Sequence, residues 1–123
     1  MHIYLGGAGH GQAALCETET GLRPVSYEND PDAACTAPAV ADFHLLVRAV
    51  LARGGDAQDF ARRLLAENPG AVLTCDFIGG GIVPLDPDER RWREETGRAL
   101  GILCADPGTR LTRVWYGLPE VLK

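Results

Sequence analysis

The chain has 123 residues, of which 46% are hydrophobic and 24% are charged, and its formal net charge is −5. These values are typical of one soluble globular domain, here residues 1–123, that is long enough to bury a core. The acidic balance argues against nucleic acid or an anionic membrane as partner, because both select basic patches. No apolar stretch has the length of a membrane span. The only lysine is Lys123, so an internal lysine cannot serve in a site.

The four cysteines, Cys16, Cys35, Cys75 and Cys104, include no CxxC pair. Cys75 and Cys104 lie in apolar segments, where we expect small core residues. A chain of this length can fold without disulfides, and its first residues show no secretory leader pattern. We therefore expect free thiols and a cytoplasmic protein.

The amino terminus predicts a strand, a glycine-rich loop and a helix in succession. Residues 2–5 are a short apolar run that is typical of a buried parallel strand. Residues 6–11 hold four glycines. We expect a helix from about residue 12 to residue 19, with Gly21 just after its end.

The middle of the chain indicates two amphipathic helices after an irregular stretch. Residues 22–38 are rich in proline and turn-forming residues, and only residues 25–27 suggest a short strand there. Asp42 follows a short apolar piece and can cap a helix over 43–53, whose apolar residues recur at helical spacing. Asp56 can cap the next helix, which an Asn-Pro-Gly sequence ends.

The second half predicts the central strand and the longest helix. Residues 71–75 are typical of a buried strand, and a glycine turn over 79–81 follows them. Asp86 precedes a proline and, three residues later, a glutamate, which together indicate a helix start. We expect a last strand over 111–116, after which residues 117–119 should turn the tail outward.

Strands that alternate with helices predict an α/β fold with a small, mainly parallel sheet flanked by helices. The carboxyl ends of parallel strands lie at one sheet edge, so the glycine loop and the 79–81 turn should flank one ligand site. A sheet this small leaves edges and helix faces exposed, and we therefore expect a homo-oligomer.

The amino-terminal loop has part of a phosphate-binding pattern. A Walker A loop is G-x-x-x-x-G-K-[ST], and Gly6 and Gly11 have this spacing, but Gln12 and Ala13 follow them. The lysine that neutralises phosphate charge and the hydroxyl that holds Mg²⁺ are thus both replaced. The loop N–H groups could still bind an anion at the helix N-terminus. A tight strand–helix turn without a ligand explains the spacing equally well.

Further residues could serve a site at the same edge. His10 could face a phosphate, although a lone histidine in a loop is more often simply exposed. Asp76 ends the central strand and could bind a metal or a hydroxyl, or cap the next turn. Asp42 and His44 are two residues apart, which on a helix directs them to different faces and argues against a pair.

The long helix carries arginines that could reach an anionic ligand. They are Arg90, Arg93 and Arg98, and the preceding turn contributes Gly79 and Gly81 as further ligand-site candidates. The alternative is a solvated helix face, on which the arginines pair with neighbouring glutamates.

Four parts of the chain resemble the adenosylcobinamide kinase / adenosylcobinamide-phosphate guanylyltransferase family of cobalamin biosynthesis. Gly6–Ala13 is similar to that family's G-G-A-x-x-G-K-S. Residues 76–84, D-F-I-G-G-G-I-V-P, and residues 90–98, R-x-W-R-x-x-x-G-R, are similar to two later family motifs. Residues 114–119, V-W-Y-G-L-P, and the terminal Lys123 resemble its carboxyl end. The resemblance covers both ends of the chain closely and the middle weakly.

The resemblance implies a P-loop NTPase-like (RecA-like) three-layer fold. It implies phosphoryl transfer from GTP or ATP, with Mg²⁺, to cobinamide, and then transfer of GMP through a guanylylated histidine. It also implies that Asp42 matches the aspartate that organises Mg²⁺. The nucleotide-binding positions that it implies are Gly6, Gly7, Ala8, Gly9, His10, Gly11, Gln12 and Ala13.

The chain also departs from the family pattern. Gln12 and Ala13 replace the lysine and serine, Phe77 replaces a glutamate, and the segment expected to carry the guanylylated histidine is missing. Single electrostatic contacts are each worth roughly a hundred-fold in rate, so phosphoryl transfer should be slower by several orders of magnitude.

Two functional hypotheses remain. The first is a divergent kinase/guanylyltransferase of weak activity, with arginines supplying charge and Asp42, Asp76 and His10 as candidate catalytic residues. The second, which the lost groups favour, is a non-catalytic module that binds a nucleotide, a corrinoid or a partner subunit.

Overall fold

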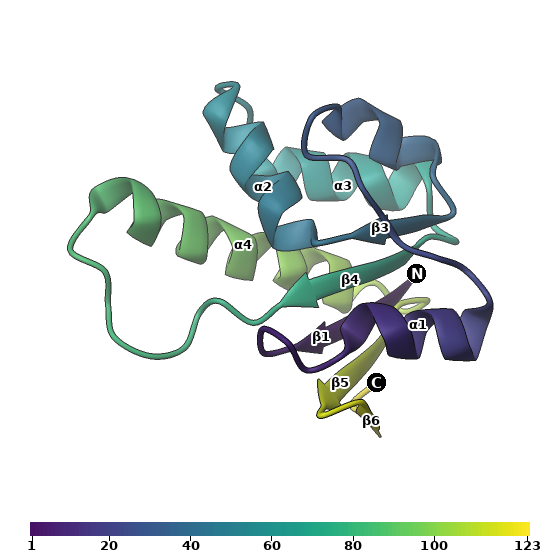
Figure 1. The fold of residues 1–123 in the computed structure, drawn as a ribbon. Helices are drawn as coiled ribbons and strands as arrows, with labels where there is room; N and C mark the ends of the chain where they lie inside the picture. Colours follow the sequence, from purple (N-terminus) through teal and green to yellow (C-terminus); the bar gives the residue numbers. More distant parts are fainter.

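The computed structural model describes residues 1–123 and contains one six-stranded sheet with helices on both faces (Figure 1). The strands are β1 (His2–Gly6), β2 (Val25–Ser26), β3 (Ala39–Ala41), β4 (Val72–Asp76), β5 (Arg110–Trp115) and β6 (Leu118–Val121). The helices are α1 (Gln12–Thr20), α2 (Phe43–Ala52), α3 (Ala57–Glu67) and α4 (Pro87–Ala105), with a 3-10 helix over Pro31–Thr36. The predicted α/β fold with a mainly parallel sheet is confirmed.

The strand order places β1 inside the sheet. The order is β2-β3-β4-β1-β5-β6, and every neighbouring pair is parallel except β5 and β6. After β1 the chain moves through α1 to β2 and returns to β4. It then passes over β1 through α4 to reach β5. The connections from β1 and β4 thus diverge, and in open α/β sheets ligands bind at such a point, outside the carboxyl ends of the strands.

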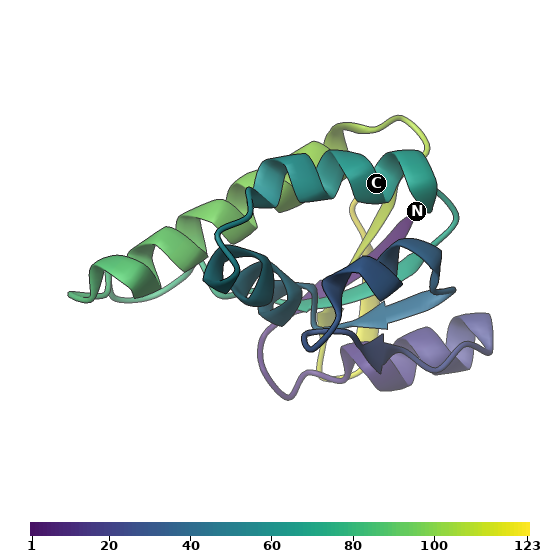
Figure 2. The same cartoon turned by 90° about the horizontal axis from the view of Figure 1, so that it is seen from above.

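Two cores hold the helices against the sheet. α1 packs on one face around Tyr4 and Cys16, whereas α2, α3 and α4 cover the other face around Ile3, Phe43 and Leu103. Figure 2 shows α3 and α4 running together on one side of the sheet and α1 on the other. Ile3 and Tyr4 are both fully buried and belong to different cores, as expected for a strand that is covered on two faces.

The predicted helix caps are confirmed at two positions and wrong at a third. Asp56 accepts hydrogen bonds from two N–H groups at the start of α3, and Asp86 accepts one from Asp88 at the start of α4. Asp42 occupies the N-cap position of α2 but makes no capping bond. Its φ is 56°, a left-handed conformation. Its carboxylate is therefore free for another role.

The carboxyl terminus corrects the expectation that the tail turns outward. Tyr116 and Gly117 both have positive φ, 48° and 78°. Two such residues form the type of turn that returns a strand along its neighbour. β6 accordingly runs back along β5, with Trp115 opposite Leu118. The turn lies at the carboxyl end of β5, next to the glycine loop.

The four cysteines are free, as predicted. Cys75 is buried in the large core, where desolvation raises the pKa of its thiol to about 12. Cys104 is only half-buried against that core. None of the helices combines the length and the hydropathy that a bilayer crossing requires.

Candidate functional site

The side chain of Gln12 closes the crevice between β1 and β4. It is 6% exposed, and its Nε2 donates to the carbonyl oxygens of Gly6 and Gly7 over 2.8 and 3.0 Å. The same Nε2 lies 3.1 Å from Oδ1 of Asp76 at the end of β4. The residue at the Walker A lysine position therefore points back to the sheet edge and joins its two central strands.

The glycines of the loop have structural roles of their own. A Cβ at Gly6 would lie 2.6 Å from the carbonyl oxygen of Val114, and a Cβ at Gly7 would lie 3.2 Å from the ring of His10. Gly9 and Gly11 have φ values of 76° and 90°. The backbone thus requires glycine at positions 6, 9 and 11 whether or not a ligand binds, whereas a side chain at Gly7 would only displace the His10 ring. Gly11 also leaves α1 without a side-chain cap, so the first N–H groups of the helix have no side-chain acceptor there.

His10 lies against the β5–β6 turn. Its ring stacks on that of Tyr116, with 4.6 Å between centroids, and its carbonyl oxygen accepts a hydrogen bond of 2.7 Å from the N–H of Gly117. Its Nδ1 lies 3.4 Å from the backbone nitrogen of Tyr116. His10 is therefore half-buried between two segments of the carboxyl edge and holds the glycine loop to the hairpin.

Three side chains with metal-binding atoms meet beyond the ends of β3 and β4. They are Asp42, His44 and Asp76, and their ligand atoms all lie within 4.8 Å of one another. Helical spacing argued against a pair of Asp42 and His44, and no hydrogen bond joins them, but their ligand atoms lie close together because Asp42 is not helical. Its left-handed backbone, with its N–H donating to Oγ1 of Thr74 over 3.1 Å, precedes the first turn of α2.

His44 positions Asp76. Its ring is buried, its Nδ1 accepts a hydrogen bond of 3.1 Å from the backbone N–H of Asp76, and its Nε2 lies 3.6 Å from Oδ2 of the same residue. Because Nδ1 accepts, a neutral ring carries its proton on Nε2, which faces the carboxylate. Neither nitrogen then offers a free lone pair to a metal. His44 and Gln12 hold the Asp76 carboxylate from two sides.

The residues present fit a hard divalent cation in donor type. Asp42 and Asp76 supply carboxylate oxygens, the ligands that Mg²⁺ prefers, whereas Ala13 supplies no hydroxyl. Both carboxylates are partly exposed, so water could complete the coordination. The sequence pointed to each aspartate separately, and the structure brings them to one place.

Four of the other predicted candidates lie together. Gly79, Gly81, Arg90 and Arg93 line a cavity of about 220 Å³ beside the start of α4. Arg93 donates to the carbonyl oxygen of Ile82 over 2.7 Å and to that of Gly80. Its guanidinium therefore holds the glycine turn in place and is already engaged.

Arg98 is not part of this group. It pairs with Glu95 over 2.7 Å on the exposed face of α4, as the alternative interpretation expected.

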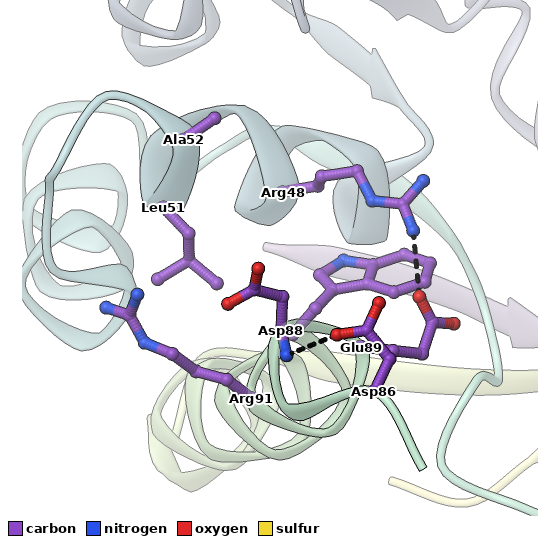
Figure 3. Close-up of a pocket in the computed structure, with 8 residues that line it drawn as sticks. Arg48, Leu51, Ala52, Asp86, Asp88, Glu89 and Arg91 are labelled. Atoms are coloured by element: carbon purple, nitrogen blue, oxygen red, sulfur yellow. Dashed lines mark hydrogen bonds and ion pairs between the residues drawn. The ribbon is translucent and has the colours of Figure 1, made fainter. Parts of the chain in front are cut away.

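A larger cavity between α2 and α4 was not indicated by the sequence (Figure 3). Its volume is about 440 Å³. The Arg48 guanidinium lies 3.8 Å from the centre of the Trp92 ring and 3.3 Å from Glu89. The indole N–H of Trp92 donates to the carbonyl oxygen of His44 over 2.7 Å. Trp92, in the wall of this cavity, thus anchors the first turn of α2, which carries His44 and so positions Asp76.

No protein-family model matches the chain, and a search of curated proteins found no match.

Proposed function

We propose that the chain is a nucleotide-binding module, related to the cobinamide kinase/guanylyltransferase family, that has lost most or all phosphoryl-transfer activity. The observation that carries the proposal is the convergence of the glycine loop, Asp42 and Asp76 at the carboxyl ends of β3, β4 and β1. A phosphate chain with its Mg²⁺ needs N–H donors on one side and carboxylates on the other.

Two features support phosphate binding at the loop. The loop follows β1 at the point where the connections of the sheet diverge, and α1 begins there at Gly11 without a side-chain acceptor. Helix N-termini of this kind favour anions through their free N–H groups and the helix dipole. A P-loop NTPase-like fold agrees with this arrangement and forms part of the proposal.

Asp42 and Asp76 are the residues that would hold Mg²⁺. The ion supplies positive charge that neutralises the phosphate oxygens. The left-handed conformation of Asp42 is uncommon for a residue that is not glycine, and such conformations are concentrated at functional sites. His44 and Gln12 would keep the Asp76 carboxylate oriented.

The same geometry argues against efficient catalysis. Gln12 is neutral, its amide already donates to three carbonyl oxygens and Asp76, and Ala13 has no hydroxyl. Transition-state charge during phosphoryl transfer would have to be stabilised by other cations. Arg90 is the candidate for a residual kinase, because it lines the cavity beside the glycine turn.

A corrinoid is the alternative ligand that the family resemblance suggests. The proposal also includes a cytoplasmic location, since four free cysteines suit a reducing compartment. It includes self-association, which exposed apolar side chains such as Ile82, Leu85 and Leu118 would favour.

Calorimetric titration with GTP and ATP, each with and without Mg²⁺, tests the proposal. We expect micromolar binding that strengthens with Mg²⁺ in the native chain and loses its Mg²⁺ dependence in Asp42→Asn. Absence of binding to either nucleotide would refute the proposal. Turnover of GTP or ATP with cobinamide that Asp42→Asn abolishes would instead support the hypothesis that the chain is an enzyme.

A further inference from the structure

We propose that a third cavity, on the β5 side of β1, binds a planar aromatic anion through Arg113 and the aromatic side chains around it. This cavity has a volume of about 340 Å³ and lies between the glycine loop and the β5–β6 hairpin. It does not include Asp42, His44 or Asp76. It shares Gly6, Gly7 and His10 with the glycine loop, but Arg113, which gives the cavity its charge, has no part in the proposed Mg²⁺-nucleotide site.

The walls of the cavity are mainly apolar and aromatic. Leu5 and Arg113 are partners in the parallel register of β1 and β5, so their side chains lie on the same face of the sheet. Trp115, two residues further along β5, lies on that face as well and is 40% exposed. Phe77, just beyond β4, is 61% exposed. Partly exposed aromatic rings in a concave site provide surfaces on which a planar ligand can stack.

Arg113 gives the cavity its charge. Its guanidinium lies 4.0 Å from the centre of the Trp115 ring, and it makes no ion pair and no side-chain hydrogen bond. A guanidinium that is held flat by stacking keeps its N–H groups free for a bidentate bond to a carboxylate or phosphate. Glu120 is opposite Arg113 in the strand register, yet the two form no ion pair.

The positive charge of this cavity is unusual for an acidic chain. The net charge is −5, but no aspartate or glutamate lines the cavity, whereas Arg113 and His10 do. By contrast, three carboxylates, from Asp86, Asp88 and Glu89, line the α2–α4 cavity. An anion is therefore favoured beside Arg113, whereas the α2–α4 cavity also has Arg48 and Arg91 in its lining and carries mixed charge.

These features together indicate the ligand chemistry. The volume is at the small end of the range for small-molecule pockets, about 300–1,000 Å³, and suits one or two fused rings. The ring would lie against the Arg113 guanidinium or Phe77, and its carboxylate or phosphate would pair with Arg113. An aromatic carboxylic acid and a nucleoside monophosphate both have this chemistry.

The test is a separate titration of the full chain with each of 1-naphthoate, AMP and inorganic phosphate. Binding is measured by calorimetry and by tryptophan fluorescence. We expect 1-naphthoate or AMP to bind and phosphate alone to bind at least tenfold more weakly. Arg113→Met should weaken binding about tenfold or more, which corresponds to the loss of one charged hydrogen-bonded contact. Arg110→Met, an exposed arginine on the same strand, is the matched control and should leave binding unchanged.

Further variants separate the possible outcomes. Trp115→Phe should remove the ligand-dependent fluorescence change, because the remaining tryptophan, Trp92, lies between α2 and α4. Glu120→Gln should strengthen binding by removing the nearest negative side chain in the register. Binding of 1-naphthoate without AMP assigns an aromatic acid, and binding of both admits a nucleotide.

The proposal is overturned if neither aromatic anion binds. It is also overturned if Arg113→Met and Arg110→Met weaken binding equally. Asp42→Asn should leave 1-naphthoate binding unchanged, so failure of the proposed Mg²⁺-nucleotide site can be distinguished from failure of this one.

Discussion

Nε2 of Gln12 lies 3.1 Å from Oδ1 of Asp76, so the first turn of α1 is joined to the carboxyl end of β4. The two residues are 64 positions apart in the chain. In a Walker A pattern a lysine occupies the position of Gln12. Here that position holds a neutral amide that contacts both sides of the crevice.

Loss of the Gln12 amide should destabilise the fold. Gln12→Ala leaves the carbonyl oxygens of Gly6 and Gly7 and the Asp76 carboxylate without this donor, and we expect a loss of about 2 kcal/mol in the free energy of unfolding. Urea denaturation followed by circular dichroism measures it. Gln58→Ala, in the first turn of α3, is the control and should cost less than half as much, because that side chain makes no hydrogen bond. Equal losses would show that the Gln12 contacts contribute little.

Restoring the missing Walker A residues should increase nucleotide affinity. In the double variant Gln12→Lys, Ala13→Ser the ammonium can pair with Asp76 or a phosphate, and the hydroxyl can bind Mg²⁺. We expect the dissociation constant for Mg²⁺-GTP or Mg²⁺-ATP to fall at least tenfold by calorimetry. The single variant Ala13→Ser should have a smaller effect. Unchanged affinity in the double variant would mean that the loop does not contact phosphates.

We expect Asp42 to lower the stability of the fold while contributing to Mg²⁺-dependent nucleotide binding. Its φ of 56° is strained for a side chain with a Cβ, and it makes no capping bond. Asp42→Gly should therefore raise the free energy of unfolding by about 1 kcal/mol. It should also remove Mg²⁺-dependent nucleotide binding.

Asp56→Ala provides the comparison for Asp42. It removes a genuine cap and should lower stability by about 1 kcal/mol while leaving binding unchanged. Thermal denaturation and calorimetry measure both quantities. A destabilised Asp42→Gly chain would show that the aspartate has a structural function instead.

The stability of the fold should fall in mildly acidic solution because of His2. Desolvation and the nearby Arg110 lower the pKa of His2 below its ordinary value of 6.5. The unfolded chain therefore binds more protons than the folded chain below about pH 6.5, and the free energy of unfolding decreases as the pH falls through that region. His2→Gln can keep a hydrogen bond to Thr112 and should flatten the dependence. Urea denaturation at pH 7.5, 6.5 and 5.5 measures the slope, and an identical slope in the variant would exclude His2 as its source.

Local sequence patterns predicted most of the secondary structure. Apolar spacing, the caps at Asp56 and Asp86, and glycines with positive φ such as Gly21 depend on residues a few positions apart, so they can be read without the fold. The errors occurred where local rules were ambiguous. The 3-10 helix over Pro31–Thr36 resembles a loop in composition, and the return of β6 depends on a tyrosine, Tyr116, with positive φ.

The candidate site is formed by contacts between residues that are far apart in the sequence. The sequence by itself determined the strand–glycine loop–helix unit and the absence of its lysine and hydroxyl, because these are properties of neighbouring residues. Only the tertiary structure decided that Gln12 meets Asp76, that His44 positions that carboxylate, and that Arg113 faces a cavity without acidic residues. The physical reason is that the order of parallel strands decides which loops share an edge. That order results from packing the whole chain rather than from any local periodicity.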